Sequence, residues 1–173
     1  MSMKHAVLGL LDLSPLTGYD LKRAFDETVN HFWSGDQAQI YRTLTALVAS
    51  GLADVEVVPQ QGRPDRRVHH ITDAGRDELD SWLTAPAEPA PERSEFLAKL
   101  FFSPRLPDAA IADLLGQRRT AATTAWETLS ALAAAEGTGT TRAERLRLST
   151  LSNGLAHARA ELDWLETMDR EFT

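Results

Sequence analysis

The stretch from residue 34 to residue 76 reads SGDQAQIYRTLTALVASGLADVEVVPQQGRPDRRVHHITDAGR. It contains an apolar-faced helical pattern, a β-rich run, a turn rich in glycine and proline, a second β-rich run and the start of another helix. We expect Ser34 to be the N-cap of the first helix, with Gln37 at its third position bonding back to the Ser34 N–H. This helix should continue to about Ser50, because Gly51 can adopt the left-handed conformation that ends many helices.

The helix expected over residues 34–50 has an outer face that is poor in charge. Gln39, Arg42, Thr43 and Ala46 share this face at helical spacing, opposite a stripe of large apolar side chains. In the major groove of DNA, Arg can fork onto guanine, Gln onto adenine, and a methyl group can meet thymine. The helix alone favours neither base reading nor an ordinary solvated face.

A hairpin with a basic turn follows this helix. Residues 52–58 and 66–71 are rich in strand-forming side chains, and Arg63, Arg66 and Arg67 gather at the turn between them. Three helices followed by such a hairpin make the winged helix-turn-helix order, in which the third helix enters the major groove. The hairpin, or wing, can then lie on phosphates or reach the minor groove, although a solvated basic loop is the alternative.

Three further helices complete the pattern of the first half. The apolar run over residues 4–12 predicts a first helix that ends at Ser14-Pro15. Thr17 should cap a second helix, with Asp20 completing an approximate capping box. Thr72 should cap a helix that runs to about Leu83.

Composition limits the function classes that the chain can fill. The net charge is −7, with 8 Lys+Arg against 12 Asp+Glu in residues 1–84 and 10 against 13 in residues 85–173. Any contact with DNA must therefore be local, since neither half is basic. The chain has no cysteine and no apolar run of the roughly 18 residues that a membrane span needs. We expect a cytoplasmic protein that binds no membrane, metal or cofactor.

The second half begins with the proline-rich stretch 85–91, which is typical of a linker. A short helix is expected over residues 92–102, a long one over 108–136, and a last one after the capping box Thr141-Arg142-Ala143-Glu144. The predicted organisation is a DNA-binding domain over 1–84, the linker, and a helical dimerisation domain over 92–173. The fold class is mainly α with a small β-hairpin wing.

The last helix carries a seam of leucines at alternating spacings of three and four. A helical hairpin of this size cannot bury the seam together with its aromatic side chains, so a homodimer is predicted; a monomeric three-helix bundle is the alternative. The predicted dimerisation residues are Leu148, Leu151, Leu155, Leu162 and Leu165.

These segments, in this order, resemble the PadR family of transcriptional regulators. The matching pieces are Leu8-Gly9-Leu10-Leu11, Thr17-Gly18-Tyr19-Asp20-Leu21, Phe32-Trp33-Ser34, Gln39-Ile40-Tyr41-Arg42-Thr43-Leu44, Gly51-Leu52, Gly62-Arg63-Pro64-Asp65-Arg66-Arg67 and Ile71-Thr72-Asp73-Ala74-Gly75-Arg76. The resemblance implies a homodimeric, mostly repressing DNA-binding protein that is released by a small aromatic or drug-like effector. It also implies roles for the tyrosines of the helix-turn-helix, in packing or at phosphate.

The candidate DNA-binding residues are thus Ser34, Gln37, Gln39, Tyr41, Arg42, Thr43, Tyr19, Arg63, Arg66 and Arg67. Their partner would be a double-stranded, palindromic operator, because a dimer presents two reading helices. An effector cavity between the wing domain and the C-terminal helices would draw its lining from Phe96, Phe101, Phe102, Trp126 and Trp164, which could instead be core.

Two other function classes compete with a regulator. An enzyme is disfavoured, because the chain has no glycine-rich phosphate loop, no His-Glu-x-x-His, no Gly-x-Ser-x-Gly and only scattered histidines. A winged-helix module used only for protein contacts remains the alternative, although it would need neither the outer face of the third helix nor the wing arginines.

Overall fold

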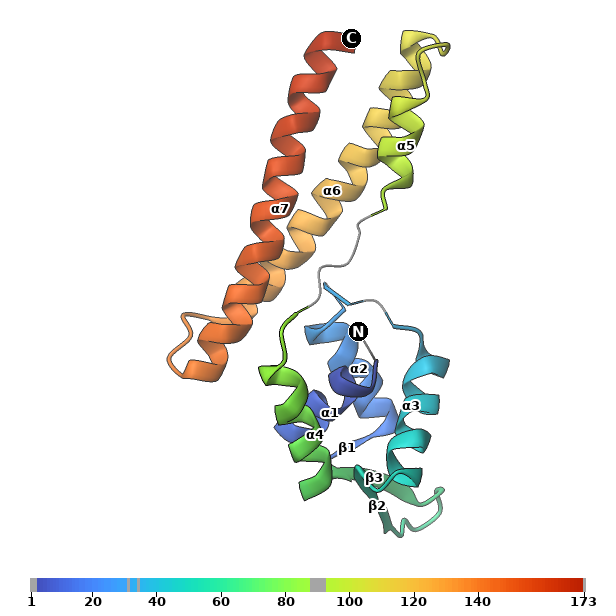
Figure 1. Cartoon of the computed structure of the whole chain (residues 1–173), viewed down its shortest axis with the longest axis vertical. Helices are drawn as coiled ribbons and strands as arrows, with labels where there is room; N and C mark the ends of the chain where they lie inside the picture. The colour runs from blue at the N-terminus through green and yellow to red at the C-terminus, as the bar shows by residue number, and fades with distance from the viewer. Residues whose placement is uncertain (1–2, 31, 34, 88–92, 173) are drawn as a thin grey trace. The chain divides into compact units, whose positions relative to one another are not determined.

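The computed structural model describes residues 3–30, 32–33, 35–87 and 93–172. The chain forms two compact units, Met1–Glu88 and Pro89–Thr173 (Figure 1). The unit boundary falls within the stretch predicted as a linker, of which residues 88–91 lie outside the described part. No helix in the described part is long and apolar enough to cross a membrane.

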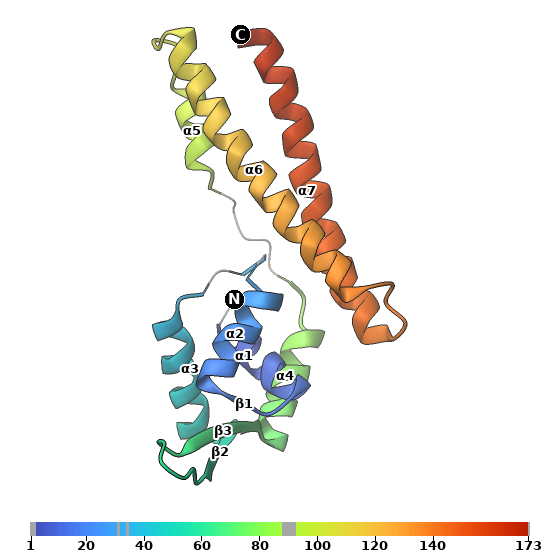
Figure 2. The same ribbon diagram turned by 180° about the vertical axis from the view of Figure 1, so that it is seen from behind.

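The N-terminal unit is a winged helix-turn-helix. Its elements are α1 (Met3–Leu13), β1 (Leu16–Thr17), α2 (Gly18–Thr28), α3 (Gln37–Ala49), β2 (Ala53–Val58), β3 (Arg66–Ile71) and α4 (Asp73–Thr84). The sheet has the antiparallel order β1-β3-β2 and lies at one end of the unit, next to the end of α3 (Figure 2). The predicted helices and hairpin are all present.

Side-chain caps fix where the helices of this unit begin. The Thr17 hydroxyl accepts the Asp20 N–H at 3.1 Å, and the Thr72 hydroxyl accepts the Gly75 N–H at 3.1 Å. Both predicted caps are confirmed.

The predicted start of α3 is wrong. Asp36 is the N-cap, its carboxylate accepts the Gln39 N–H at 2.7 Å, and Gln37 is the first helical residue. A carboxylate at the positive end of the helix dipole makes a charge-assisted bond that a serine hydroxyl cannot match. The side chain of Ser34 lies outside the described residues.

One apolar cluster holds the N-terminal unit together. Phe25 and Leu21 of α2 are fully buried there, with Ile40 and Leu47 of α3 and most of the inner face of α1. The two-residue strand β1 was not predicted, because such a short strand leaves no alternating pattern. It pairs with β3, Thr17 opposite Val68, and so joins the start of α2 to the wing.

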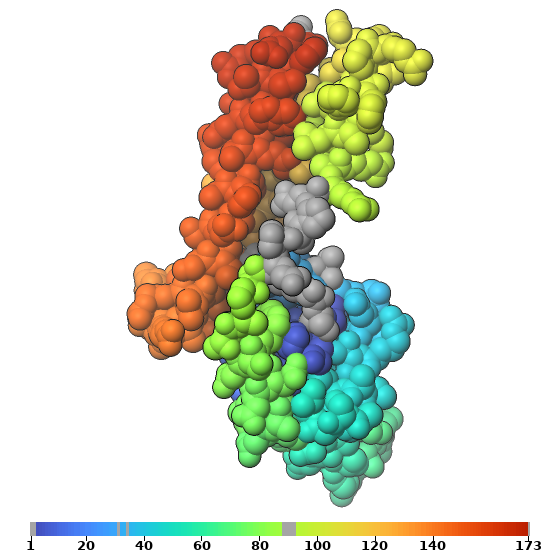
Figure 3. All heavy atoms as spheres, in the orientation of Figure 1, coloured from blue at the N-terminus to red at the C-terminus, as the bar shows by residue number. Residues whose placement is uncertain are grey.

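The C-terminal unit consists of α5 (Glu95–Phe101), α6 (Asp108–Glu136) and α7 (Arg142–Phe172). α5 and α7 lie on the visible face in Figure 3, with α6 partly behind them. α5 is shorter than predicted because Ser94 caps it, accepting the Leu97 N–H at 3.2 Å. The capping box at α7 is confirmed: Thr141 N–H donates to Glu144 Oε2 at 2.9 Å, and Glu144 N–H to Thr141 Oγ1 at 3.2 Å.

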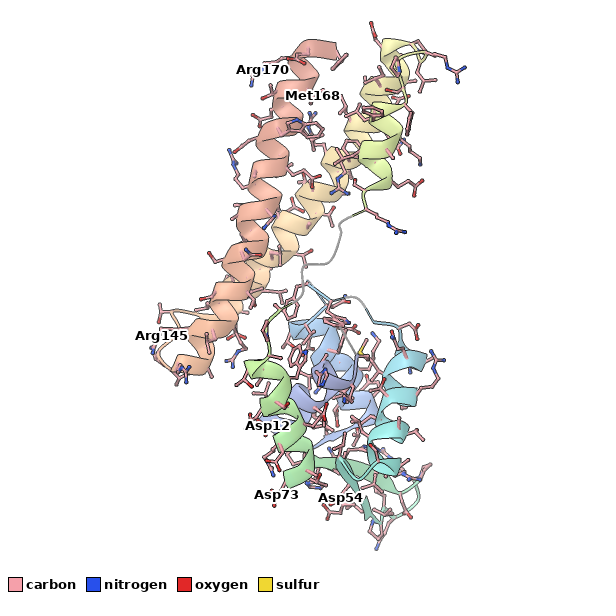
Figure 4. The ribbon with its side chains drawn as sticks, viewed as in Figure 1. Asp12, Asp54, Asp73, Arg145, Met168 and Arg170 are labelled. Atoms are coloured by element: carbon pink, nitrogen blue, oxygen red, sulfur yellow. The ribbon has the colours of Figure 1, made fainter. Side chains whose placement is uncertain are left out.

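The long helices α6 and α7 pack along a small core. Leu115 and Ala122 of α6 meet Leu165 of α7, and Met168 points from α7 toward this core (Figure 4). Arg118 makes a forked ion pair with Glu161, Nε–Oε1 2.6 Å and Nη2–Oε2 2.9 Å. The pair ties the helices together at the edge of the core.

The leucine seam of α7 serves this intramolecular packing in part. Leu151 and Leu165 are buried within a single chain, with exposed fractions of 5% and 0%. Leu148, Leu155 and Leu162 are only partly buried. Two of the five leucines predicted for dimerisation are therefore already occupied, and the role of the seam in a dimer stays a prediction.

Candidate nucleic-acid interface

The outer face of α3 is exposed as its spacing predicted. Gln37, Gln39 and Arg42 are exposed and Thr43 is partly so, whereas Ile40 on the other side is buried. Arg42 has no ion-pair partner among the described residues, so its guanidinium is available to a ligand. The outer face presents one amide, one guanidinium and one hydroxyl, from Gln39, Arg42 and Thr43, while Gln37 is exposed at the first helical position.

The first turn of α2 lies beside this face. Tyr41 of α3 packs its ring on Gly18, where an added Cβ would lie 2.6 Å from Tyr41 Cε1. A side chain at position 18 would displace the Tyr41 ring. Tyr41 remains 41% exposed, and the neighbouring Tyr19 is 70% exposed. Tyr41 of α3 and Tyr19 of α2 are thus both exposed, and neither hydroxyl has a hydrogen-bond partner among the described residues.

The wing carries its arginines on the other side of the same turn of α2. Arg63 and Arg67 are exposed and have no ion-pair partner in the described part of the chain. Arg66 differs, because its Nη2 donates to Asp20 Oδ2 at 3.3 Å. Gly62 adopts a φ of 71° in the turn between the strands, a conformation that favours glycine.

The sequence did not reveal that Asp20 has a second role, as a partner of Arg66 in the wing. The sequence indicates only that it caps α2, yet it also contacts the wing. The Thr17 hydroxyl donates to Asp20 Oδ2 at 2.8 Å, and this bond, followed by Arg66, lowers the pKa of the carboxyl. Asp20 therefore remains ionised at neutral pH, so its attraction for Arg66 persists.

Two acidic side chains of the unit pair with the same arginine. Asp12 and Asp73 lie toward α1 and α4 (Figure 4). Both pair with Arg76, at 3.3 Å and 2.9 Å respectively. Arg76 is thereby engaged within the fold, and the cations of α3 and the wing tip, Arg42, Arg63 and Arg67, keep their charge uncompensated by any ion pair in the described part.

The five aromatic residues considered for an effector do not form one cluster. Phe96 and Trp164 meet edge to face, with ring centroids 6.1 Å apart, and the Arg118 guanidinium lies 5.6 Å from the Phe96 centroid. Phe101 and Phe102 pair with each other but are 77% and 75% exposed. Trp126 is partly buried on α6.

Family models cover most of the chain. Residues 7–81 match the transcriptional regulator PadR-like family, and residues 92–172 match the family described as virulence activator alpha C-term. The boundary between the two matches falls close to the boundary between the two units of the fold.

Two relatives are named as transcriptional regulators, one of them as a probable one. The chain is 39% identical over 89 residues to a probable transcriptional regulator of Mycobacterium tuberculosis, covering 51% of this chain and 47% of that protein. It is 34% identical over 114 residues to the negative transcriptional regulator PadR of Bacillus subtilis, covering 65% and 62%. The matches thus span less than two thirds of either relative.

The solved structures of Bacillus subtilis PadR match the whole chain. PadR in complex with operator DNA superposes with a TM-score of 0.87 at 25% identity, covering 99% of both chains. PadR in complex with p-coumaric acid gives 0.80 at 25% identity, covering 98% of both. These relatives are regulators rather than enzymes. The winged helix-turn-helix, the family match over residues 7–81 and these relatives together show that the N-terminal unit carries a domain of the transcriptional regulator PadR-like family.

Proposed function

We propose that this protein represses transcription by binding a palindromic operator as a homodimer. The observation that carries the proposal is the arrangement around the first turn of α2. On one side α3 contacts Gly18 through Tyr41, and on the other side the wing is bonded to Asp20 through Arg66. One side can enter a major groove while the other contacts the adjacent backbone.

The two sides have different chemistry, and this suggests a division of labour. Gln39 and Arg42 have the donor and acceptor geometry that distinguishes bases, with Gln37, Thr43 and the tyrosines next to them. Arg63, Arg66 and Arg67 supply charge, which suits phosphate or a narrow minor groove. The relative named as a negative transcriptional regulator supports repression. A protein that binds the operator would work in the cytoplasm, where the DNA is.

The test begins with sheared genomic DNA. The fragments that the wild-type protein captures are sequenced, and a labelled duplex of the best site is titrated between about 50 and 200 mM salt. Replacing Arg63, Arg66 and Arg67 together by alanine should weaken binding and reduce the salt slope by about 0.9 for each phosphate that is no longer neutralised.

A matched control removes the same charge from the other unit. Arg142, Arg145 and Arg159 are exposed on α7, so their joint replacement by alanine changes the net charge equally. This control should leave the affinity and the salt slope close to those of the wild type. Equal effects of the two triple variants would overturn the assignment of the wing.

The homodimer would form through the C-terminal unit. Leu97, Phe101, Phe102 and Leu106 of this unit are all more than half exposed, an amount of apolar surface that single chains rarely leave in water. A second chain covering this surface would present two α3 helices to two half-sites about 34 Å apart.

A small aromatic effector is the second part of the proposal. Bacillus subtilis PadR has been solved with p-coumaric acid, and in this chain Phe96, Trp164 and Arg118 place two rings and a guanidinium together. p-Coumarate serves as the probe, and its binding should quench tryptophan fluorescence and lower operator affinity. The quenching should be lost in Trp164→Phe and kept in Trp126→Phe; quenching that survives Trp164→Phe would contradict the site.

A further inference from the structure

The outer half of the wing has little apolar packing to hold it. In the strands, Ala53, Val68 and Ile71 are buried, whereas residues 56–67 are exposed throughout. The pairing of β2 with β3 fixes the two strands to each other, as far as Val58 opposite Arg66. It does not fix the end of the hairpin against the helices.

One side-chain bond joins this exposed half to the helix-turn-helix. Arg66, the first residue of β3, donates from Nη2 to Asp20 Oδ2 at 3.3 Å. The described residues show no other side-chain hydrogen bond between residues 58–67 and α2. Beyond the pairing of β1 with β3 at Val68, this bond is thus the side-chain link between the outer half and α2 in the described part of the chain.

The Asp20 carboxylate is itself held in place. Its Oδ2 accepts the Thr17 hydroxyl at 2.8 Å, while Arg23 of the next turn approaches Oδ1 at 3.8 Å. Thr17 belongs to β1, which pairs with β3 two residues beyond Arg66. The Asp20 carboxylate thus accepts hydrogen bonds from Thr17 of β1 and from Arg66 of the wing at the same time. These two bonds restrict the positions of the carboxylate and of the Arg66 guanidinium.

Arg66 keeps donors for a second partner. A guanidinium has five N–H groups, and the bond to Asp20 uses one nitrogen. The side chain is 50% exposed, so its remaining N–H groups face solvent. Arg66 can therefore bind a phosphate while Asp20 holds it.

We propose that Asp20 is a positioning residue for the DNA interface: it holds Arg66, and through Arg66 the wing, in the orientation that contacts the DNA backbone. The inference rests on the proposed function. Simple electrostatics predicts the opposite effect. A carboxylate near DNA repels phosphate, so removal of the Asp20 charge alone should tighten binding.

That opposition makes Asp20→Asn an informative variant. Asparagine keeps the size of the side chain and an oxygen that can accept the Thr17 hydroxyl, but it removes the charge that attracts Arg66. If Asp20 positions the wing, affinity for the captured genomic duplex should fall roughly two- to fivefold, the range that exposed ion pairs support. The salt slope should fall as well, because Arg66 no longer neutralises a phosphate. Tighter binding with a steeper slope would overturn the proposal.

Two further variants separate positioning from folding. Asp20→Glu retains the charge at a capping-box position that accepts glutamate, so it should restore binding close to wild type. Glu27→Gln removes a charge from the same helix, where the nearest partner is Arg23 at 3.9 Å, and should not weaken binding. Thermal unfolding of each variant shows whether the fold has changed.

A double-mutant cycle tests whether Asp20 acts through Arg66. In an Arg66→Ala background, Asp20→Asn should no longer weaken binding, because the group it positions is absent. A decrease as large as in the wild-type background would contradict the proposal. If the wild-type chain captured no duplex, both the proposed function and the inference would be contradicted. If the wild-type chain bound the duplex and Asp20→Asn bound it with the same affinity, only the inference would be contradicted.

Discussion

The two units of this protein bury their apolar side chains to different degrees. Among the described residues, the cluster of the N-terminal unit contains thirteen buried side chains, and that of the C-terminal unit contains four. The C-terminal unit also leaves Phe101 and Phe102 largely exposed. The N-terminal unit therefore has the larger core, and the two exposed rings of the C-terminal unit are part of the surface that the proposed dimer would cover.

The largest expected effect concerns the two kinds of phenylalanine. Phe25→Ala empties a fully buried site in the N-terminal core and should lower the free energy of unfolding by about 3–5 kcal/mol. Phe101→Ala removes a ring that already meets solvent, so in dilute solution it should change this free energy by less than about 0.5 kcal/mol. Urea unfolding followed by circular dichroism measures both, and similar decreases would contradict the difference between the units.

The same exposed rings should control association. Phe101→Asp together with Phe102→Asp should raise the dissociation constant of the dimer about tenfold or more, because a charge replaces apolar surface at the contact. Sedimentation over a range of protein concentrations measures the constant. Val57→Asp, an exposed change on β2, is the control and should leave association unchanged. Unaltered sedimentation of the double variant would remove these rings from the interface.

A smaller effect is expected at the ion pairs of the helical unit. Arg118→Ala removes the fork onto Glu161 and the contact with the Phe96 ring, and should cost about 1 kcal/mol once solvent exposure is allowed for. Arg159→Ala removes an exposed pair within one helix, with Asp163 at 3.0 Å, and should cost about 0.3 kcal/mol. Thermal unfolding distinguishes the two, and equal shifts would show that the fork stabilises the unit no more than an exposed pair does.

The smallest expected effect is a pH dependence of the N-terminal unit. Burial lowers the pKa of His69 from its ordinary value of 6.5. As the pH falls, the unfolded chain therefore binds a proton on His69 at a higher pH than the folded chain does. The free energy of unfolding decreases as the pH drops from about 6.5 toward the lower pKa of the folded state. His69→Leu should flatten this part of the profile of unfolding midpoint against pH. A profile that keeps its slope in the variant would assign the effect elsewhere.

Periodicity and caps were enough to predict most of the fold. The hairpin, the caps at Thr17, Thr72 and Thr141, and the extent of α6 follow from local rules that tertiary packing did not override. The start of α3 did not follow from these rules. Ser34 and Asp36 can both cap a helix, and the structure uses Asp36, whose carboxylate is charged. The strand β1 was too short to leave a pattern.

The site was predictable as a set of exposed residues but not as a set of contacts. The helical spacing of Gln39 and Arg42 indicated that they are exposed. The turn between two strand-forming runs indicated that the wing arginines are exposed. The bond between Asp20 and Arg66 joins residues 46 positions apart, so no local pattern could indicate it. The leucine seam likewise did not reveal that Leu151 and Leu165 pack within the chain.

The ratio of affinities for the captured site and for unrelated duplex tests most directly whether α3 reads bases while the wing contacts the backbone. Gln39→Ala changes no charge, so it should lower this ratio roughly tenfold or more and leave the affinity for unrelated duplex unchanged. The triple alanine variant of Arg63, Arg66 and Arg67 should weaken both affinities and leave the ratio nearly constant. A ratio that is insensitive to Gln39→Ala but collapses in the wing variant would contradict this division.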